Sequence, residues 1–213
     1  MRLTILAEGE GLIAVDKPAG LESTGRTPSD PGGVEHHLRS KLGRQVWLVH
    51  QLDRDTSGVL LFVTRKRLVA PTSELLRSGE KRYLALVARP VPWDRHALSA
   101  ALRYDRHRRR WIVDPAGKAA QTRFERIGPA GSPSALWAFP RTGRTHQIRV
   151  HLEHLGLPLL GERKYAQPPC EGAPRHALHL DRVKLADGRI FHSPLPPDLA
   201  PLIPFSPRAL PEP

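Results

Sequence analysis

His50-Gln51-Leu52-Asp53-Arg54-Asp55-Thr56-Ser57-Gly58 is a polar segment that lies between two apolar runs, Val46–Val49 and Val59–Val63. Short apolar runs predict buried strands, and a polar segment held between two strands is typical of a loop that carries chemistry. Asp53 can act in such a loop as a nucleophile or as a base. The local pattern also fits a solvated turn in which an aspartate bonds to the backbone, so both interpretations stay open at this point.

The composition limits the class of protein. A chain of 213 residues is long enough for one well-filled domain or two small ones. Its net charge of +12 and its isoelectric point near 10.8 favour a polyanionic partner. A single cysteine, Cys170, excludes an internal disulfide and a cysteine-based zinc site. The N-terminus lacks the apolar core of a signal peptide, and no apolar run approaches the roughly 18 residues that span a bilayer, so we expect a cytoplasmic protein without a membrane span.

Hydrophobic periodicity predicts many short strands and few helices. A helix is expected at Val34–Leu42, ended by Gly43, and another at Thr72–Ser78, with Pro71 near its first turn. Residues 22–33 are rich in Ser, Thr, Gly and Pro and are expected to form a mobile loop. Further strands are expected at Leu3–Leu6, Leu12–Val15, Lys81–Val87, Leu98–Leu102, Trp111–Val113, Gln121–Ile127, Ala135–Phe139, His176–Leu180 continuing to Val183–Leu185, and Arg189–Phe191.

A cluster of arginines falls in the expected connection between two of these strands: Arg103, Arg106, Arg108, Arg109 and Arg110. A run of like charges is often only a solvated face. On a chain that is already strongly basic, we favour a patch that contacts phosphates.

The stretch Thr142–Gly156 predicts an amphipathic helix. Ile148, Leu152 and Leu155 form its apolar stripe, and Gly156 is a natural terminator. Arg149 lies at the edge of that stripe, where a partly buried arginine needs an anionic partner. His151 and His154 suggest a metal site, but no third ligand has the spacing to complete it, so we expect no metal.

Four segments in the same order resemble the pseudouridine synthases of the RluA type. The segment at 50–58 resembles their catalytic loop His-Arg-Leu-Asp-x-x-Thr-Ser-Gly, and Asp16–Gly20 resembles their Asn/Asp-Lys-Pro-x-Gly turn. Lys81–Val87 matches Lys-x-Tyr-x-Ala-x-Val, and the stretch from Gly143 to Gly161 resembles Gly-Arg-Thr-His-Gln-Ile-Arg-Val-His-Leu with the Gly-x-Pro-Leu-Leu-Gly that follows it.

This resemblance implies an α+β fold, in which helices and loops flank a mixed, mainly antiparallel sheet. It implies one pseudouridine synthase catalytic domain at 1–198, a Pro-rich C-terminal tail at 199–213, and no small RNA-binding domain before the catalytic one.

The resemblance also implies roles for single residues. Asp53 would be the catalytic residue, Tyr83 would lie against the target base, and Arg149 would pair with the aspartate. Three positions depart from the family pattern: Gln51 replaces the arginine that helps to displace the target base, Glu162 stands in place of an aspartate, and Leu180 stands in place of an alanine. Contacts to the RNA are expected from His50, Gln51, Arg54, Thr56, Arg144, Arg106, Arg108, Arg109 and Arg110.

The expected function is isomerisation of a specific uridine to pseudouridine in ribosomal or transfer RNA, after the base has been flipped into a pocket. This reaction is redox-neutral, so we expect no cofactor. We expect RNA as the partner and a monomeric enzyme. The resemblance does not decide whether Asp53 attacks the ribose or the base. Two other functions would use the same residues: a non-catalytic basic RNA-binding module, and a metal-dependent nuclease that uses Asp53, Asp55 and the histidines.

Overall fold

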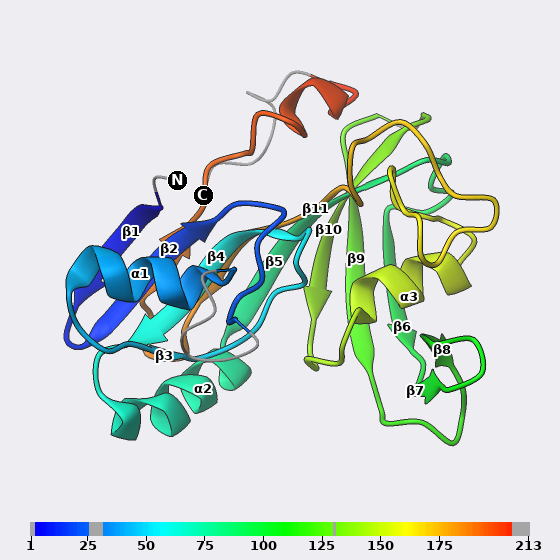
Figure 1. The fold of residues 1–213 in the computed structure, drawn as a ribbon. Helices are drawn as coiled ribbons and strands as arrows, with labels where there is room; N and C mark the ends of the chain where they lie inside the picture. Colours follow the sequence, from blue (N-terminus) through cyan, green and yellow to red (C-terminus); the bar gives the residue numbers. More distant parts are fainter. Residues whose placement is uncertain (1–2, 26–31, 130, 206–213) are drawn as a thin grey trace. The chain divides into compact units, whose positions relative to one another are not determined.

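The structure, a computed structural model, describes residues 3–25, 32–129 and 131–205 (Figure 1). It divides into two compact units, which we call unit 1 (Met1–Lys81 and His179–Pro196) and unit 2 (Arg82–Leu178 and Pro197–Pro213). The chain passes from one unit to the other inside two strands, β5 (Glu80–Val87) and β11 (Leu178–Lys184). Part of the expected loop at 22–33 lies outside the described residues.

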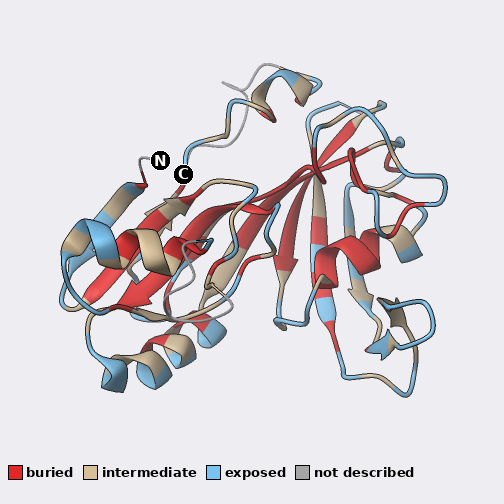
Figure 2. Cartoon of the chain, in the orientation of Figure 1, coloured by how far each residue is buried: buried red, intermediate tan, exposed pale blue. Residues whose placement is uncertain are grey.

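Unit 1 is built around strand β4 (Ser57–Val63), which is buried along its whole length (Figure 2). On one side, β4 pairs antiparallel with β2 (Leu12–Lys17). On its other side, the first residues of β4 pair parallel with β11, and the last residues of β4 pair antiparallel with β3 (Trp47–Leu48). The remaining elements of unit 1 are β1 (Thr4–Gly9), β12 (Ile190–His192), α1 (Val34–Leu42), η1 (Lys66–Leu68) and α2 (Val69–Ser78).

Unit 2 contains an antiparallel sheet in the order β5-β10-β9-β6 and a separate hairpin of β7 and β8. The bounds are β6 (Arg95–Ser99), β7 (Leu102–Asp105), β8 (Arg110–Val113), β9 (Gln121–Ile127), β10 (Ser134–Pro140), α3 (Gln147–His154) and η2 (Ala200–Leu202).

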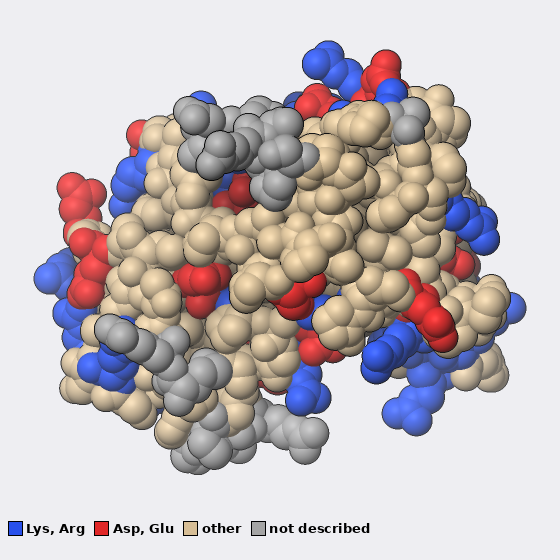
Figure 3. Space-filling model, turned by 90° about the horizontal axis from the view of Figure 1, so that it is seen from above, with Lys and Arg blue, Asp and Glu red and all other residues tan. Residues whose placement is uncertain are grey.

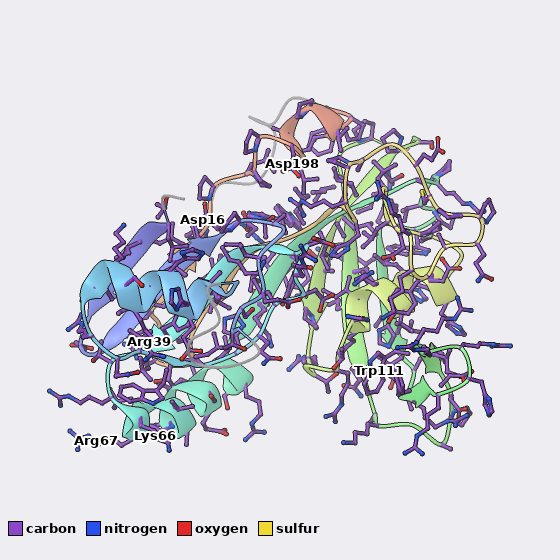
Figure 4. The ribbon with its side chains drawn as sticks, in the orientation of Figure 1. Asp16, Arg39, Lys66, Arg67, Trp111 and Asp198 are labelled. Carbon is purple, nitrogen blue, oxygen red and sulfur yellow. The ribbon has the colours of Figure 1, made fainter. Side chains whose placement is uncertain are left out.

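The hairpin β7–β8 has a small core of its own. Leu102 from β7, Val150 from α3 and Tyr165 from the segment after α3 are buried together, and Trp111 from β8 packs against them (Figure 4). This cluster fixes the hairpin to the helix that carries Arg149.

The predicted α+β class with a mixed, mainly antiparallel sheet is confirmed. The helix at Val34–Leu42 has the predicted bounds, and Gly43 ends it in the left-handed region at φ 62°. The second helix begins at Val69 and not at Thr72, because Pro71 is only its third residue, where a backbone N–H has no partner within the helix in any case.

One strand prediction is wrong. Leu98 and Leu102 do not share a strand, since β6 ends at Ser99 and Leu102 begins β7. Leu102 is fully buried in the small hairpin core, and its backbone pairs with Lys118 through two hydrogen bonds of 2.8 and 2.9 Å. The chain changes partner between the two strands: β6 pairs with β9, whereas Leu102 pairs with β8 and with Lys118.

The first residues after Asp198 are not a loose tail. Leu199 is fully buried and Ile203 is nearly so, so the first residues of the expected tail pack into unit 2. Residues 206–213, the rest of that tail, lie outside the described residues.

Candidate active site

The turn that carries Asp53 is closed by backbone hydrogen bonds. The Thr56 N–H donates to the Asp53 carbonyl at 3.0 Å. Just before Asp53, the Leu52 N–H donates to the Ser23 hydroxyl oxygen at 2.9 Å, and that hydroxyl lies 3.0 Å from the Leu52 carbonyl, to which it donates. The half-buried Asp53 carboxylate is therefore presented from a segment fixed on either side of it.

Lys17 binds the backbone of the turn on the C-terminal side of Asp53. Its side chain is fully buried, and its ammonium donates to the Arg54 carbonyl at 2.8 Å and to the Pro18 carbonyl at 2.9 Å. Gly20 adds a backbone N–H to the same Arg54 carbonyl at 2.9 Å, and the Arg54 Nε returns a bond to the Gly20 carbonyl at 3.0 Å. The Asp-Lys-Pro turn therefore braces the candidate catalytic loop. The sequence analysis assigned no role to Lys17 itself, although a lysine at the end of an apolar strand could have indicated a buried cation that binds backbone carbonyls.

Strands β4 and β11 approach each other closely at Ser57 and Gly58. Gly58 has φ +124°, and a Cβ atom there would lie 2.2 Å from the Leu180 carbonyl oxygen. Ser57 Oγ lies 2.9 Å from His179 Nδ1, and His179 Nε2 faces the Ser193 carbonyl at 3.4 Å. A carbonyl only accepts, so Nε2 carries the hydrogen and Nδ1 accepts from the Ser57 hydroxyl. The Ser-Gly part of the motif therefore contributes to the packing of β4 against β11, immediately after the turn.

His50 stands at the start of the polar segment as a neutral imidazole. Burial, with a contribution from the charge of Lys81, lowers the pKa of His50 to about 3. Its buried Nε2 has no hydrogen-bond partner in the part of the chain that the structure describes. Of the other predicted RNA contacts in this loop, Thr56 is buried, whereas Gln51 and Arg54 are exposed.

In unit 2, Tyr83 lies in β5 opposite Ala138 of β10, and only 9% of its surface is exposed. The neighbouring Arg82 is also buried, and its guanidinium lies 4.3 Å from the centre of the Trp137 ring. Tyr83 is thus held rigidly in a strand, as a residue that stacks on a base requires.

Arg149 forms a buried, bidentate ion pair with Glu162. Its Nε and Nη2 atoms donate to the two carboxylate oxygens at 2.8 and 2.9 Å, and the side chains are 8% and 1% exposed. Glu162 Oε1 also accepts the backbone N–H groups of Lys164 at 2.9 Å and Tyr165 at 3.2 Å. The anionic partner expected for a partly buried Arg149 is therefore present within unit 2.

This arrangement keeps Glu162 ionised. Burial raises the pKa of its carboxyl, but the hydrogen bonds and the charge of Arg149, together with the Lys164 N–H, outweigh burial and leave the pKa below its ordinary value. A guanidinium carries five N–H donors, and this ion pair uses two of them. Arg149 can therefore serve a second acceptor while Glu162 orients it. The resemblance names Asp53 as that acceptor. Asp53 belongs to unit 1 and Arg149 to unit 2, and their pairing stays a prediction.

The residues before Arg149 form a hydrogen-bonded start to α3. The Gln147 side chain accepts from the Thr142 hydroxyl and the Arg144 N–H at 2.7 and 3.0 Å, and donates to the Gln121 carbonyl and to Thr122 Oγ1 at 2.9 and 3.0 Å. The Arg144 side chain is exposed, with its Nε bonded to a carbonyl at 3.1 Å. This network explains why the motif requires glutamine, a role that the sequence did not indicate.

His151 is engaged in the same network. Its Nδ1 lies 2.8 Å from Thr122 Oγ1 and its Nε2 lies 3.0 Å from the Ala100 carbonyl, so both ring nitrogens have partners. Burial lowers its pKa. Among the described residues there is no group of three or more histidine, cysteine, aspartate or glutamate side chains that could hold a metal ion.

The arginine cluster lies on the β7–β8 hairpin, but not wholly in a connection as the sequence predicted, since Arg103 lies within β7 and Arg110 within β8. Arg103 forms an ion pair with Asp114, and Arg108 Nε lies 3.8 Å from Asp105. Arg106 and Arg109 are exposed in the connecting turn, and Arg110 begins β8.

Residues 11–154, about two thirds of the chain, match the family model described as RNA pseudouridylate synthase. The chain belongs to this family. It is 33% identical to the dual-specificity RNA pseudouridine synthase RluA of Escherichia coli, over 86% of each protein. It is 30% identical to a ribosomal large subunit pseudouridine synthase C of Buchnera aphidicola, over 85% of this chain and 60% of that relative.

The chain thus spans only about three fifths of the length of the synthase C relatives. A solved structure, the human RNA pseudouridylate synthase domain containing 1, has the same fold, with a TM-score of 0.76 and 23% identity over 92% of this chain and 84% of that one. In the described part of this chain, no helix is long and apolar enough to cross a membrane.

Proposed function

We propose that this chain is an RNA pseudouridine synthase that isomerises a specific uridine of ribosomal or transfer RNA, with Asp53 as its catalytic residue. The observation that carries this proposal is the bracing of the Asp53 turn by Ser23 on one side and Lys17 on the other. A solvated surface turn has no need of a fully buried lysine bonded to its backbone. A reacting carboxylate does need a fixed position, and small misplacements are costly in catalysis.

In this reaction the bond between ribose C1′ and uracil N1 breaks, the uracil rotates, and a bond forms between C1′ and C5. The C5 proton leaves to solvent and N1 gains a proton, so no oxidant, reductant or external energy source is required. Asp53 would act covalently or as a base. Tyr83 would offer its ring to the flipped uracil and its hydroxyl to the C5 proton, and Arg149 would hold the Asp53 carboxylate ionised and aimed.

We include in this proposal that residues 1–198 act together as one catalytic domain, and that the protein works as a cytoplasmic monomer on RNA. Two observations support these points. The chain crosses between the units near the starts of β5 and β11, within continuous strands. Tyr104 and Ile190 are the only large hydrophobic side chains that are exposed among the described residues.

The test is the Asp53→Asn variant with RNA labelled with tritium at C5 of uridine. We expect tritium release by the wild type and none by the variant, while RNA affinity stays within about tenfold. Turnover by Asp53→Asn above a few per cent of wild type would refute the assignment. RNA binding without tritium release by the wild type would favour a binding module, and strand cleavage abolished by a chelator would favour a nuclease.

A further inference from the structure

The arginines of the β7–β8 hairpin are part of a built hollow. Arg108, Arg109 and Arg110 line it together with Lys164 and Gln167, which come from the segment after α3, and its volume is about 440 Å³. A volume of this size falls within the range of small-ligand sites in proteins. No acidic side chain lines the hollow.

Three of the four cations that line the hollow form no ion pair with a carboxylate among the described residues. Arg109, Arg110 and Lys164 form no ion pair with any acidic residue in the described part of the chain. Asp105, the acidic residue nearest to Arg108, is occupied in shaping the hairpin, since its Oδ1 accepts the His107 and Arg108 N–H groups at 2.9 and 3.0 Å. Glu153 on α3 is close enough for the charge of Arg110 to act on the pKa of its carboxyl, although burial raises that pKa overall. An anion that enters the hollow therefore meets Arg109 and Lys164 without an ion pair, and Arg110 with one acidic group nearby.

The walls are fixed by the core beneath them. Arg110 precedes Trp111 in β8, and Lys164 precedes Tyr165, and both aromatic residues belong to the small hairpin core. Arg109 has a backbone φ of +50°, a region that non-glycine residues rarely enter. A run of arginines on an unsupported loop would be only a solvated face, whereas these side chains start from anchored positions.

We propose that this hollow binds one nucleotide of the substrate RNA other than the target uridine, holding its phosphates with Arg109, Arg110 and Lys164 and its base edge with the Gln167 amide. The proposal rests on the function proposed above, because it assumes an RNA substrate. The cations supply affinity without sequence information, and the amide, with one acceptor and two donors, supplies a polar contact to a base.

A nucleotide bound in the hollow is also expected to affect the position of Arg149. The backbone N–H of Lys164 donates to the same Glu162 carboxylate that holds the Arg149 guanidinium. A nucleotide that fixes Lys164 therefore fixes the turn that positions Arg149. Loss of the contact is expected to lower kcat as well as RNA affinity.

The test compares two triple variants that lose the same charge. The first, which we call the hollow variant, carries Arg109→Gln, Arg110→Gln and Lys164→Gln. It removes three of the four cations that line the hollow. The control carries Arg65→Gln, Lys66→Gln and Arg67→Gln, which remove three exposed cations at η1, just before α2 in unit 1, that form no ion pair among the described residues. Lys66 and Arg67 are labelled in Figure 4. The readout is the affinity for a fluorescein-labelled oligouridine between about 50 and 200 mM KCl.

We expect the hollow variant to lower the log–log salt slope by about 2, since each lost contact to a single strand removes about 0.7, and we expect the control to leave the slope nearly unchanged. Gln167→Ala should weaken binding about three- to tenfold without a change of slope, because it removes a neutral hydrogen bond. Crosslinks from 4-thiouridine in the RNA should map to residues 164–167 in the wild type and disappear in the hollow variant.

Equal slope changes in the two triple variants would overturn the proposal, since the protein would then attract RNA only through its overall charge. Competition by polyglutamate as strong as by oligouridine at equal charge would also overturn it, because the hollow would then bind any polyanion. Tritium release by the wild type is measured separately. Its absence would refute the proposed reaction while leaving a confirmed hollow in place.

Discussion

Replacing Glu162 by glutamine removes the charge that balances Arg149 in the interior of unit 2. The two side chains keep nearly the same shape, so the change tests electrostatics and hydrogen bonding and not packing. The amide nitrogen would face the Arg149 donors at one of the two positions now held by carboxylate oxygens, at 2.8 and 2.9 Å. The Arg149 guanidinium then loses its bidentate carboxylate partner in a side chain that is only 8% exposed.

Breaking a buried ion pair by removing one partner costs about 3 to 5 kcal/mol. We expect about 3 kcal/mol for Glu162→Gln, because the glutamine carbonyl can still accept the Lys164 N–H that now bonds to Oε1. With a urea m value of about 3 kcal/mol/M, this corresponds to a shift of about 1 M in the unfolding midpoint. Turnover should also fall, since Arg149 loses the group that orients it.

The effect should depend on pH with a definite sign. The pKa of Glu162 in the folded protein lies below its ordinary value of 4.5, so its contribution is complete above that value and is lost as the pH falls through the folded pKa. The difference in stability between wild type and Glu162→Gln should therefore be constant near neutral pH and shrink below about pH 4.

The assay is urea unfolding followed by tryptophan fluorescence. Three of the four tryptophans, Trp93, Trp111 and Trp137, belong to unit 2, where the ion pair is located. The matched control is Glu74→Gln, which breaks a bidentate but exposed pair with Arg77 in unit 1 and should leave the midpoint almost unchanged. Equal shifts for the two variants, or a Glu162→Gln effect that is undiminished at pH 3, would refute the reasoning.

Three further predictions concern unit 1. Gly58→Ala should lower the free energy of unfolding in urea by about 3 kcal/mol, because it combines backbone strain with overpacking. Gly188→Ala, at φ +93° with open space around it, is the control and should lower the free energy of unfolding clearly less. Lys17→Met should lower kcat at least tenfold in tritium release with little change in KM, because the Asp53 turn loses the bond from the buried ammonium to the Arg54 carbonyl, and an unchanged kcat would contradict this role. Gln51→Arg should speed single-turnover reaction of a uridine within an RNA stem more than of one in a loop, because the wild type lacks a charged side chain to open a stem there; a wild type that reacts equally fast with both would show that another residue opens the helix.

The fold was largely predictable because its strongest signals are local. Val59–Val63 is a continuous apolar run and is fully buried, and the α1 periodicity with Gly43 reproduces both ends of that helix. Asp53 could be proposed as the catalytic residue from the sequence because its motif is contiguous. Glu162 was recognised only as a departure from a family pattern, since its contact with Arg149 depends on how the chain turns after α3, which no local pattern encodes. Lys17 and His179 were missed for the same reason: their partners lie 37 and 122 residues away.

The pairing of charged residues on the surface was likewise only partly predictable from the sequence. Lys and Arg side chains protrude from the face drawn in Figure 3, interspersed with Asp and Glu. The sequence identified the cluster from Arg103 to Arg110 but not which members are neutralised. Arg103 is paired with Asp114, whereas Arg109 takes part in a hollow completed by residues more than fifty positions later.

The pairing of β4 with β11 has a consequence for synthesis on the ribosome. β4 is buried along its whole length, and its early half finds its second neighbour only in β11, which is made about 120 residues later. At about 5 to 20 residues per second, the nascent chain waits roughly 6 to 24 s with an apolar strand edge uncovered. Almost all of unit 2 is translated during that interval. Unit 1, which begins first, is therefore completed only after the main part of unit 2 has been synthesised, and a chaperone that binds nascent chains would be expected to engage the segment Val59–Val63.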